Sequence, residues 1–255
     1  MTEPIRDESG RLEQILESVD HFKPVTTRRT FMQKAMLAGG TAAVATVGLG
    51  KFANVFASSN PVLDFVNAAV GAERIGIAFY GNALGSGSPY SDTGDPADHT
   101  LLNSSHRGYF TAAFNQESSH LAALLANGGS FPFSHFAFPA GTFARTGSML
   151  AMGQNLESIF IGAYLGAVKA GASAGSSLGI FVAEVAAQIC GIECEHRVLI
   201  NDIAGVNPPN DRFYEGDVLS PPSGSLGDAG ERSQVYATAA DAVNALLALG
   251  ISPSA

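Results

Sequence analysis

Two pairs of residues in this sequence have the types and the spacing of metal ligands on a helix. Glu117 and His120 form the first pair, and Glu193 and His196 form the second. Residues three apart lie on the same face of a helix, so each pair can direct a carboxylate and an imidazole toward one point. The spacing therefore predicts two halves of a metal site, one on each of two helices.

Two further glutamates interrupt apolar segments that have helical periodicity. Glu73 shares a predicted face with Val70 and Ile77, and Glu157 shares one with Phe160. A charge in such a stripe is costly unless it is paired or bound to a metal. Along the chain, a lone glutamate twice precedes a Glu-x-x-His pair. The predicted metal ligands are Glu73, Glu117, His120, Glu157, Glu193 and His196.

A tyrosine follows each lone glutamate at the same distance. Tyr80 lies seven residues after Glu73, and Tyr164 lies seven residues after Glu157. Seven residues are nearly two helical turns, so each tyrosine shares the face of its glutamate. Each phenol is therefore expected to hydrogen-bond a ligand carboxylate from a neighbouring helix. The repeated unit suggests two duplicated halves.

The apolar periodicity predicts the helices that carry these residues, at 62–84, 107–127, 148–170 and 178–203, with a last helix at 231–249. The long connection at 128–147 contains five phenylalanines and fits a crossover between a parallel second and third helix. The short turn at 171–177 makes the third and fourth helices antiparallel. The predicted fold class is all-α, an up-down four-helix bundle with a long crossover and a C-terminal helix. Glu184 and Glu195 are predicted to face away from the centre.

The order and spacing of these motifs over residues 60–205 resemble the ferritin-like superfamily, and most closely its exported branch of desiccation-related proteins. The resemblance implies that the six glutamates and histidines bind two iron or two manganese ions, and that Tyr80 and Tyr164 support the ligands. The family includes ferroxidases, peroxide-reducing proteins, manganese catalases and oxygen-activating oxidases. The motifs that carry the resemblance are Glu73 to Tyr80, Gln116 to His120, Leu156 to Tyr164, and Glu193 to His196.

Two classes of function are compatible with this ligand set. The first is a di-metal oxidoreductase that acts on oxygen, peroxide or ferrous iron. The second is a non-catalytic bundle of the cell envelope that binds metal or protects against stress. The sequence does not choose between iron and manganese, nor does it decide which glutamates bridge, although those of the Glu-x-x-His pairs usually do. A small homo-oligomer is also left open.

The N-terminal segment resembles a twin-arginine signal peptide. Thr27 precedes Arg28 and Arg29, and Phe31 and Lys34 follow; an uncharged segment at 35–50 comes next. Cleavage is expected near Ala57, and retention of the segment as an uncleaved anchor is the alternative. The predicted domains are a signal peptide at 1–57, the bundle at 58–205 and a C-terminal region at 206–255. We therefore expect export by the twin-arginine machinery to the periplasm or another extracytoplasmic compartment.

Composition argues against one class of partner. The chain has 255 residues, a formal net charge of −9, and only 15% charged residues. An acidic chain without a Lys/Arg cluster is a poor candidate for binding nucleic acid.

Cys190 and Cys194 lie four apart on a predicted helix, which places their Cβ atoms about 6 Å apart, too far for a disulfide.

Overall fold

The structure is a computed structural model that describes residues 60–93, 101–207, 209–210 and 235–254. All of these residues fall within one compact unit. The predicted signal peptide and its cleavage site lie outside the described residues, so both stay predictions.

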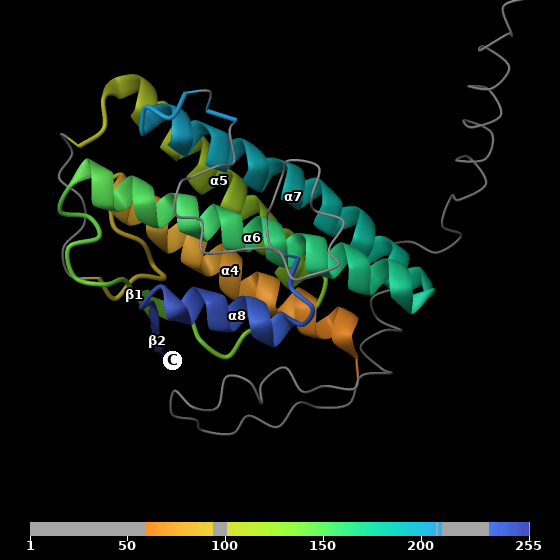
Figure 1. The fold of residues 1–255 in the computed structure, drawn as a ribbon. Coiled ribbons are helices and arrows are strands. Elements are labelled where there is room, and N and C mark those ends of the chain that lie inside the picture. The colour runs from red at the N-terminus through yellow and green to blue at the C-terminus, as the bar shows by residue number, and fades with distance from the viewer. Residues whose placement is uncertain (1–59, 94–100, 208, 211–234, 255) are drawn as a thin grey trace, which may run out of the picture. The chain divides into compact units, whose positions relative to one another are not determined.

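Four long helices dominate the described part of the chain (Figure 1). Each lies within a few residues of its predicted position, which confirms the all-α prediction. Asparagine or serine side chains cap three of the helix starts, because their oxygens accept hydrogen bonds from the first free backbone N–H groups. The four helices are α4 (Pro61–Ala83), α5 (Ser104–Ala126), α6 (Thr146–Ala174) and α7 (Ser177–Ile203).

Contacts between the helices establish their directions. Arg107 near the start of α5 donates a hydrogen bond to the carbonyl of Leu84 at the end of α4, so these two helices are antiparallel. Tyr80 of α4 contacts Glu157 of α6, whereas the earlier Glu73 contacts the later Tyr164, so α4 and α6 are also antiparallel. It follows that α5 and α6 are parallel, as the predicted crossover requires.

The crossover is attached to the bundle by polar contacts that the sequence did not predict. The guanidinium of Arg74 donates hydrogen bonds to the carbonyls of Phe131 (3.1 Å) and Phe133 (2.7 Å). The segment then forms a short strand, β1 (His135–Ala137), which pairs antiparallel with β2 (Ser252–Ser254) near the C-terminus. This pairing joins the end of the described chain to the crossover.

The connection between α6 and α7 is shorter than predicted. The helix continues through Gly171 to Ala174 and ends at Gly175, whose φ of 58° is left-handed. Gly171 is needed for packing instead: a Cβ there would lie 2.4 Å from the carbonyl oxygen of Gly179 on α7. The glycine therefore marks a close approach of two helices, which sequence alone does not distinguish from a turn.

The predicted start of the C-terminal helix was wrong. The helix, α8 (Ala239–Ala248), begins eight residues later than position 231, and residues 235–238 are not helical. A capping box explains the start, because the side chain of Thr238 accepts from the backbone N–H of Asp241 and the Asp241 carboxylate accepts from the backbone N–H of Thr238. The helix ends before Gly250, as predicted, and packs on α4 and α6.

Helix α7 is the one described helix that is long and apolar enough to span a membrane by length and composition. It also carries Glu193 and His196, which are buried inside the bundle. Only about a third of its most apolar stretch is buried in the described structure, and these two residues mark the face that points into the bundle. Cys190 and Cys194 lie on this helix and form no disulfide. The neighbouring Cys194 thiol and burial together raise the pKa of Cys190, which suits an unreactive thiol.

Candidate metal centre

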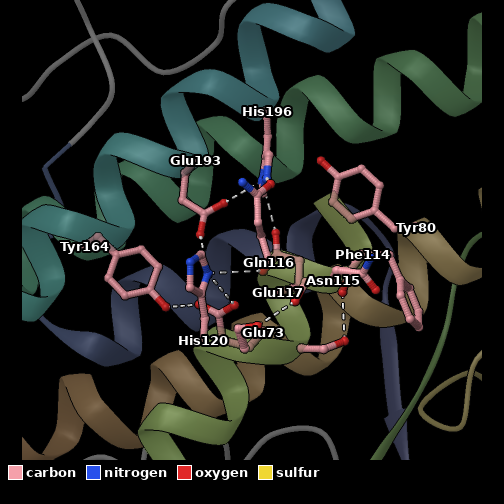
Figure 2. A network of polar contacts seen from close by, with 12 residues as sticks. Glu73, Tyr80, Phe114, Asn115, Gln116, Glu117, His120, Tyr164, Glu193 and His196 are labelled. Carbon is pink, nitrogen blue, oxygen red and sulfur yellow. Dashed lines mark hydrogen bonds and ion pairs between the residues drawn. The ribbon is translucent and has the colours of Figure 1, made fainter. Parts of the chain in front are cut away.

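The structure brings all six predicted ligands together in the middle of the bundle. Figure 2 labels all of them except Glu157. Each of the four long helices contributes one glutamate, and α5 and α7 each add a histidine. The four carboxylates and the imidazole of His196 are almost completely buried. His120 differs, since 14% of its side chain is exposed.

The ligands form two overlapping groups, each of three glutamates and one histidine. In each group, the ligand atoms lie within 4.8 Å of one another. Both groups contain Glu117 and Glu193, which are the glutamates of the two Glu-x-x-His pairs. These two carboxylates are therefore in position to bridge two ions. The first group is Glu73, Glu117, His120 and Glu193, and the second is Glu117, Glu157, Glu193 and His196.

In the first group, the Nδ1 atom of His120 faces three carboxylates. It lies 3.3 Å from Glu73 Oε2, 3.7 Å from Glu193 Oε1 and 4.0 Å from Glu117 Oε2. The carboxylates come from three different helices, so the group exists only in the assembled bundle.

The second group has the same arrangement around His196. Its Nδ1 atom lies 3.2 Å from both Glu117 Oε1 and Glu193 Oε2, and 3.8 Å from Glu157 Oε1. The two Glu-x-x-His pairs therefore point at each other across the bundle. Each histidine contacts the glutamate of its own pair and the glutamate of the other.

Several buried ligand atoms make no hydrogen bond, although some of them lie within ion-pair distance of a histidine nitrogen. They are Glu73 Oε2, both carboxylate oxygens of Glu117, His120 Nδ1, Glu157 Oε2 and Glu193 Oε1. Buried polar atoms are nearly always satisfied in folded proteins, and an uncompensated buried charge is costly. Oxygen and imidazole donors converging on one buried point, with lone pairs unused, fit divalent iron or manganese.

The electrostatics of the metal-free site favour bound protons. Burial and the neighbouring carboxylates Glu193 and Glu73 raise the pKa of Glu117 well above its usual range. Burial, opposed by the contact with His196 and aided by Glu157 and Glu73, also raises the pKa of Glu193. Burial lowers the pKa of His196, but its contacts with Glu117, Glu157 and Glu193 raise it overall. Positive charge is thus attracted to this point.

These pKa directions predict how the metal-free protein responds to pH. Glu117 and Glu193 have folded-state pKa values above the unfolded value of about 4.3, so the folded state binds more protons above that pH. The contribution of this protonation to the free energy of unfolding is full below about pH 4.3. It decreases as the pH rises toward the folded-state pKa values. The raised pKa of His196 acts in the same direction above about pH 6.5.

We therefore expect the free energy of unfolding of the chelator-treated protein to fall between pH 5 and pH 8. Urea denaturation at several pH values measures it. A double variant, Glu117→Gln with Glu193→Gln, should flatten the dependence because it removes two of the responsible carboxyls. Stability that rises with pH over this window in the wild type would contradict the assignment.

Each tyrosine reaches across to the other lone glutamate. The hydroxyl of Tyr80 on α4 donates to Glu157 on α6, and that of Tyr164 on α6 donates to Glu73 on α4. Burial, followed by the negative partner carboxylate, raises the pKa of both phenols, so each stays a hydrogen-bond donor. The seven-residue spacing predicted which face the tyrosines share, and the structure adds that the two contacts are reciprocal.

Sequence reasoning assigned no role to two residues that contact the site. The side-chain oxygen of Gln116 lies 2.9 Å from Nε2 of His196 (Figure 2). Gly76 faces the carboxylate of Glu117, and a Cβ there would lie 2.9 Å from its carboxyl carbon. Neither contact follows from spacing within one helix. Both depend on how α4, α5 and α7 align with one another.

The fold and the site together define a four-helix bundle with a buried cluster of carboxylates and imidazoles. A family model described as a ferritin-like domain matches residues 62–206. The chain therefore belongs to the ferritin-like family. No curated protein and no solved structure matches it.

Proposed function

We propose that this chain is an exported ferritin-like protein that binds a carboxylate-bridged pair of iron or manganese ions and acts as an oxidoreductase on oxygen, peroxide or ferrous iron. One observation carries the proposal. Two groups of metal-ligand residues share Glu117 and Glu193, and these two shared carboxylates are buried in the bundle core. A single isolated cluster would support only metal binding, whereas two clusters that share carboxylates support a coupled pair of ions.

The charges of the site match two divalent cations. Four ionised carboxylates carry four negative charges, and both histidines are neutral when they bind metal, so two divalent ions leave the centre uncharged. Glu73 and His120 would complete the shell at one position, and Glu157 and His196 would complete it at the other. Oxygen-rich ligands with imidazole suit iron and manganese, both of which change oxidation state.

When bound, the metals would supply redox chemistry at a pair of adjacent ions. The chain's own residues would bind the ions, orient the ligands and exclude water. Tyr80 and Tyr164 hold Glu157 and Glu73 by donating hydrogen bonds, which orients the two carboxylates that would each bind a single ion. The apolar core around them, including Phe79, limits the access of water. A dry, preorganised site of this kind favours reaction at the metals over side reactions.

Export is proposed from the N-terminal motif alone. A cofactor-binding protein suits a twin-arginine route, since that route is known for moving folded proteins. Fractionation of cells that express the full chain tests the proposal. The mature protein should appear outside the cytoplasm, and a variant with Arg28→Lys and Arg29→Lys should be retained inside. Equal export of both chains would contradict it.

The function is tested by metal content followed by turnover. The full chain, purified without added metal and assayed by mass spectrometry, should contain two iron or manganese ions in total. Metal-loaded protein should then consume oxygen or peroxide, or oxidise added ferrous iron, with repeated turnover. Two ions without turnover would leave a non-catalytic metal-binding protein. A folded chain that takes up neither ion would overturn the metal centre itself.

A further inference from the structure

The two proposed metal positions have the same ligand types but different surroundings. Each combines Glu117 and Glu193 with one further glutamate and one histidine. The side chain of His196 is 1% exposed, whereas that of His120 is 14% exposed. Two chemically equal positions are therefore placed in unequal environments, and the difference lies in the histidines.

His196 is held on both sides of its ring. Nδ1 points at the carboxylates of Glu117 and Glu193, and Nε2 lies 2.9 Å from the side-chain oxygen of Gln116. An amide oxygen only accepts hydrogen bonds, so this contact keeps the proton on Nε2 and leaves Nδ1 as the metal-binding nitrogen. The ring of Tyr80 packs edge-on against the imidazole, with centroids 5.6 Å apart. Both the tautomer and the orientation of His196 are thereby set.

His120 has no equivalent support in the described part of the chain. Its ion-pair contacts are those of Nδ1 with the carboxylates of Glu73, Glu117 and Glu193. Gln116 immediately precedes Glu117 on α5, and the residue that precedes Glu193 on α7 is Ile192. An isoleucine side chain cannot accept a hydrogen bond. The duplicated halves thus differ at the position that supports the opposite histidine.

The exposed side of His120 lies on α5, one turn beyond Gln116 on the same face. Helices α5 and α7 contact each other less than the pairs α4 with α5 and α6 with α7 do. Partial exposure of His120 places its ligand position closer to solvent than that of His196. His196 has no comparable exposure.

We propose that Gln116 makes the two metal positions unequal: by supporting His196 it creates a tightly held, slowly exchanging ion, and the ion at His120 exchanges readily with solution. The inference rests on the proposed function, because it requires that both groups bind metal. It goes beyond that function by assigning the order in which ions leave the centre. Gln116 acts as a positioning residue, since it contacts a ligand and is not itself one.

Withdrawal of Mn²⁺ by a chelator tests the proposal on the full chain. The wild type should lose its two ions in a fast and a slow phase of equal amplitude. In Gln116→Leu, which removes the acceptor at similar volume, the slow phase should become about 10 to 100 times faster and the fast phase should stay unchanged. In Gln116→Glu, which keeps an acceptor, the slow phase should persist. The variant His120→Ala should retain the slow phase alone.

The matched control is Gln188→Leu, the same substitution at an exposed position on α7. It should leave both phases as in the wild type, and circular dichroism should show equal helix content in all variants. A wild type that loses both ions in one phase would overturn the inference while leaving the two-ion centre intact. A Gln116→Leu variant whose slow phase is unchanged, or whose two phases accelerate equally, would also overturn the inference and leave the two-ion centre intact. A wild type that binds no Mn²⁺ or iron would overturn the proposed function and the inference together.

Discussion

Replacing Glu117 or Glu193 by glutamine is expected to abolish binding of both metal ions and, at the same time, to stabilise the metal-free chain. Each of these carboxylates belongs to both ligand groups, so its loss affects both positions. Each is also completely buried among other carboxylates, which raises its pKa. Burying these acidic groups therefore lowers the free energy of unfolding of the metal-free protein, and we expect them to be buried for metal binding alone.

The expected size of the stabilisation follows from the physics of buried charge. A carboxyl whose pKa is raised by burial costs folding about 1.4 kcal/mol at neutral pH for each unit by which its pKa is raised, and glutamine, which carries no charge at any pH, avoids this cost. For a chain of this length, about 1 kcal/mol corresponds to a rise of roughly 2 to 4 °C in Tm. Glu117→Gln should thus raise the Tm of the chelator-treated protein at pH 7 by several degrees, as measured by calorimetry.

Glu195→Gln is the matched control, because Glu195 lies on α7 between Glu193 and His196 and is exposed. It should keep both ions and leave the Tm of the metal-free chain nearly unchanged. A Glu117→Gln variant that retained two ions would refute its bridging role. One that lost its ions and was less stable without metal would show that Glu117 is a structural member of the core.

The features predicted correctly from the sequence depend on spacing within one helix. The i, i+3 pairs and the seven-residue spacing of Tyr80 and Tyr164 from the lone glutamates are properties of single helices, and the structure places these side chains where the helical period does. The crossover was predictable because a connection of this length allows parallel neighbours. The surface positions of Glu184 and Glu195 followed from the same period, and both residues are exposed.

The features that sequence reasoning missed depend on contacts between elements. Gln116 reaches His196 on another helix, 80 residues later, so nothing in its own neighbourhood indicates the contact. The β1–β2 pair joins the crossover in the middle of the bundle sequence to the C-terminal end of the described chain, and each strand is only three residues long. The start of α8 was missed because apolar spacing continued upstream, whereas the capping box at Thr238 decides where the helix begins.

Gly76 shows most directly how helix alignment controls the centre, and Gly76→Ala is expected to weaken both metal positions without unfolding the bundle. The added Cβ would lie 2.9 Å from Cδ and 3.0 Å from Oε2 of Glu117. Real contacts of this kind are longer, so the carboxylate has to shift, and it is fully buried with little room to do so. Ligands need to be held within about 0.5 Å of their working geometry, so we expect the affinity for each ion to fall by at least about tenfold.

Gly76→Ala has two opposing effects on the stability of the fold, so a loss of metal affinity can be distinguished from a loss of the fold. Alanine is favoured over glycine inside a helix by about 1 kcal/mol, which offsets part of an overpacking cost of about 1 to 3 kcal/mol. Gly191→Ala is the control, since Gly191 is exposed on α7 near Glu193 and a Cβ there meets nothing within 4 Å. That variant should keep wild-type Mn²⁺ affinity in calorimetric titration. If Gly76→Ala also kept wild-type Mn²⁺ affinity, the Glu117 carboxylate would have to bind metal from a position away from Gly76. The bridging geometry inferred for both groups would then be wrong.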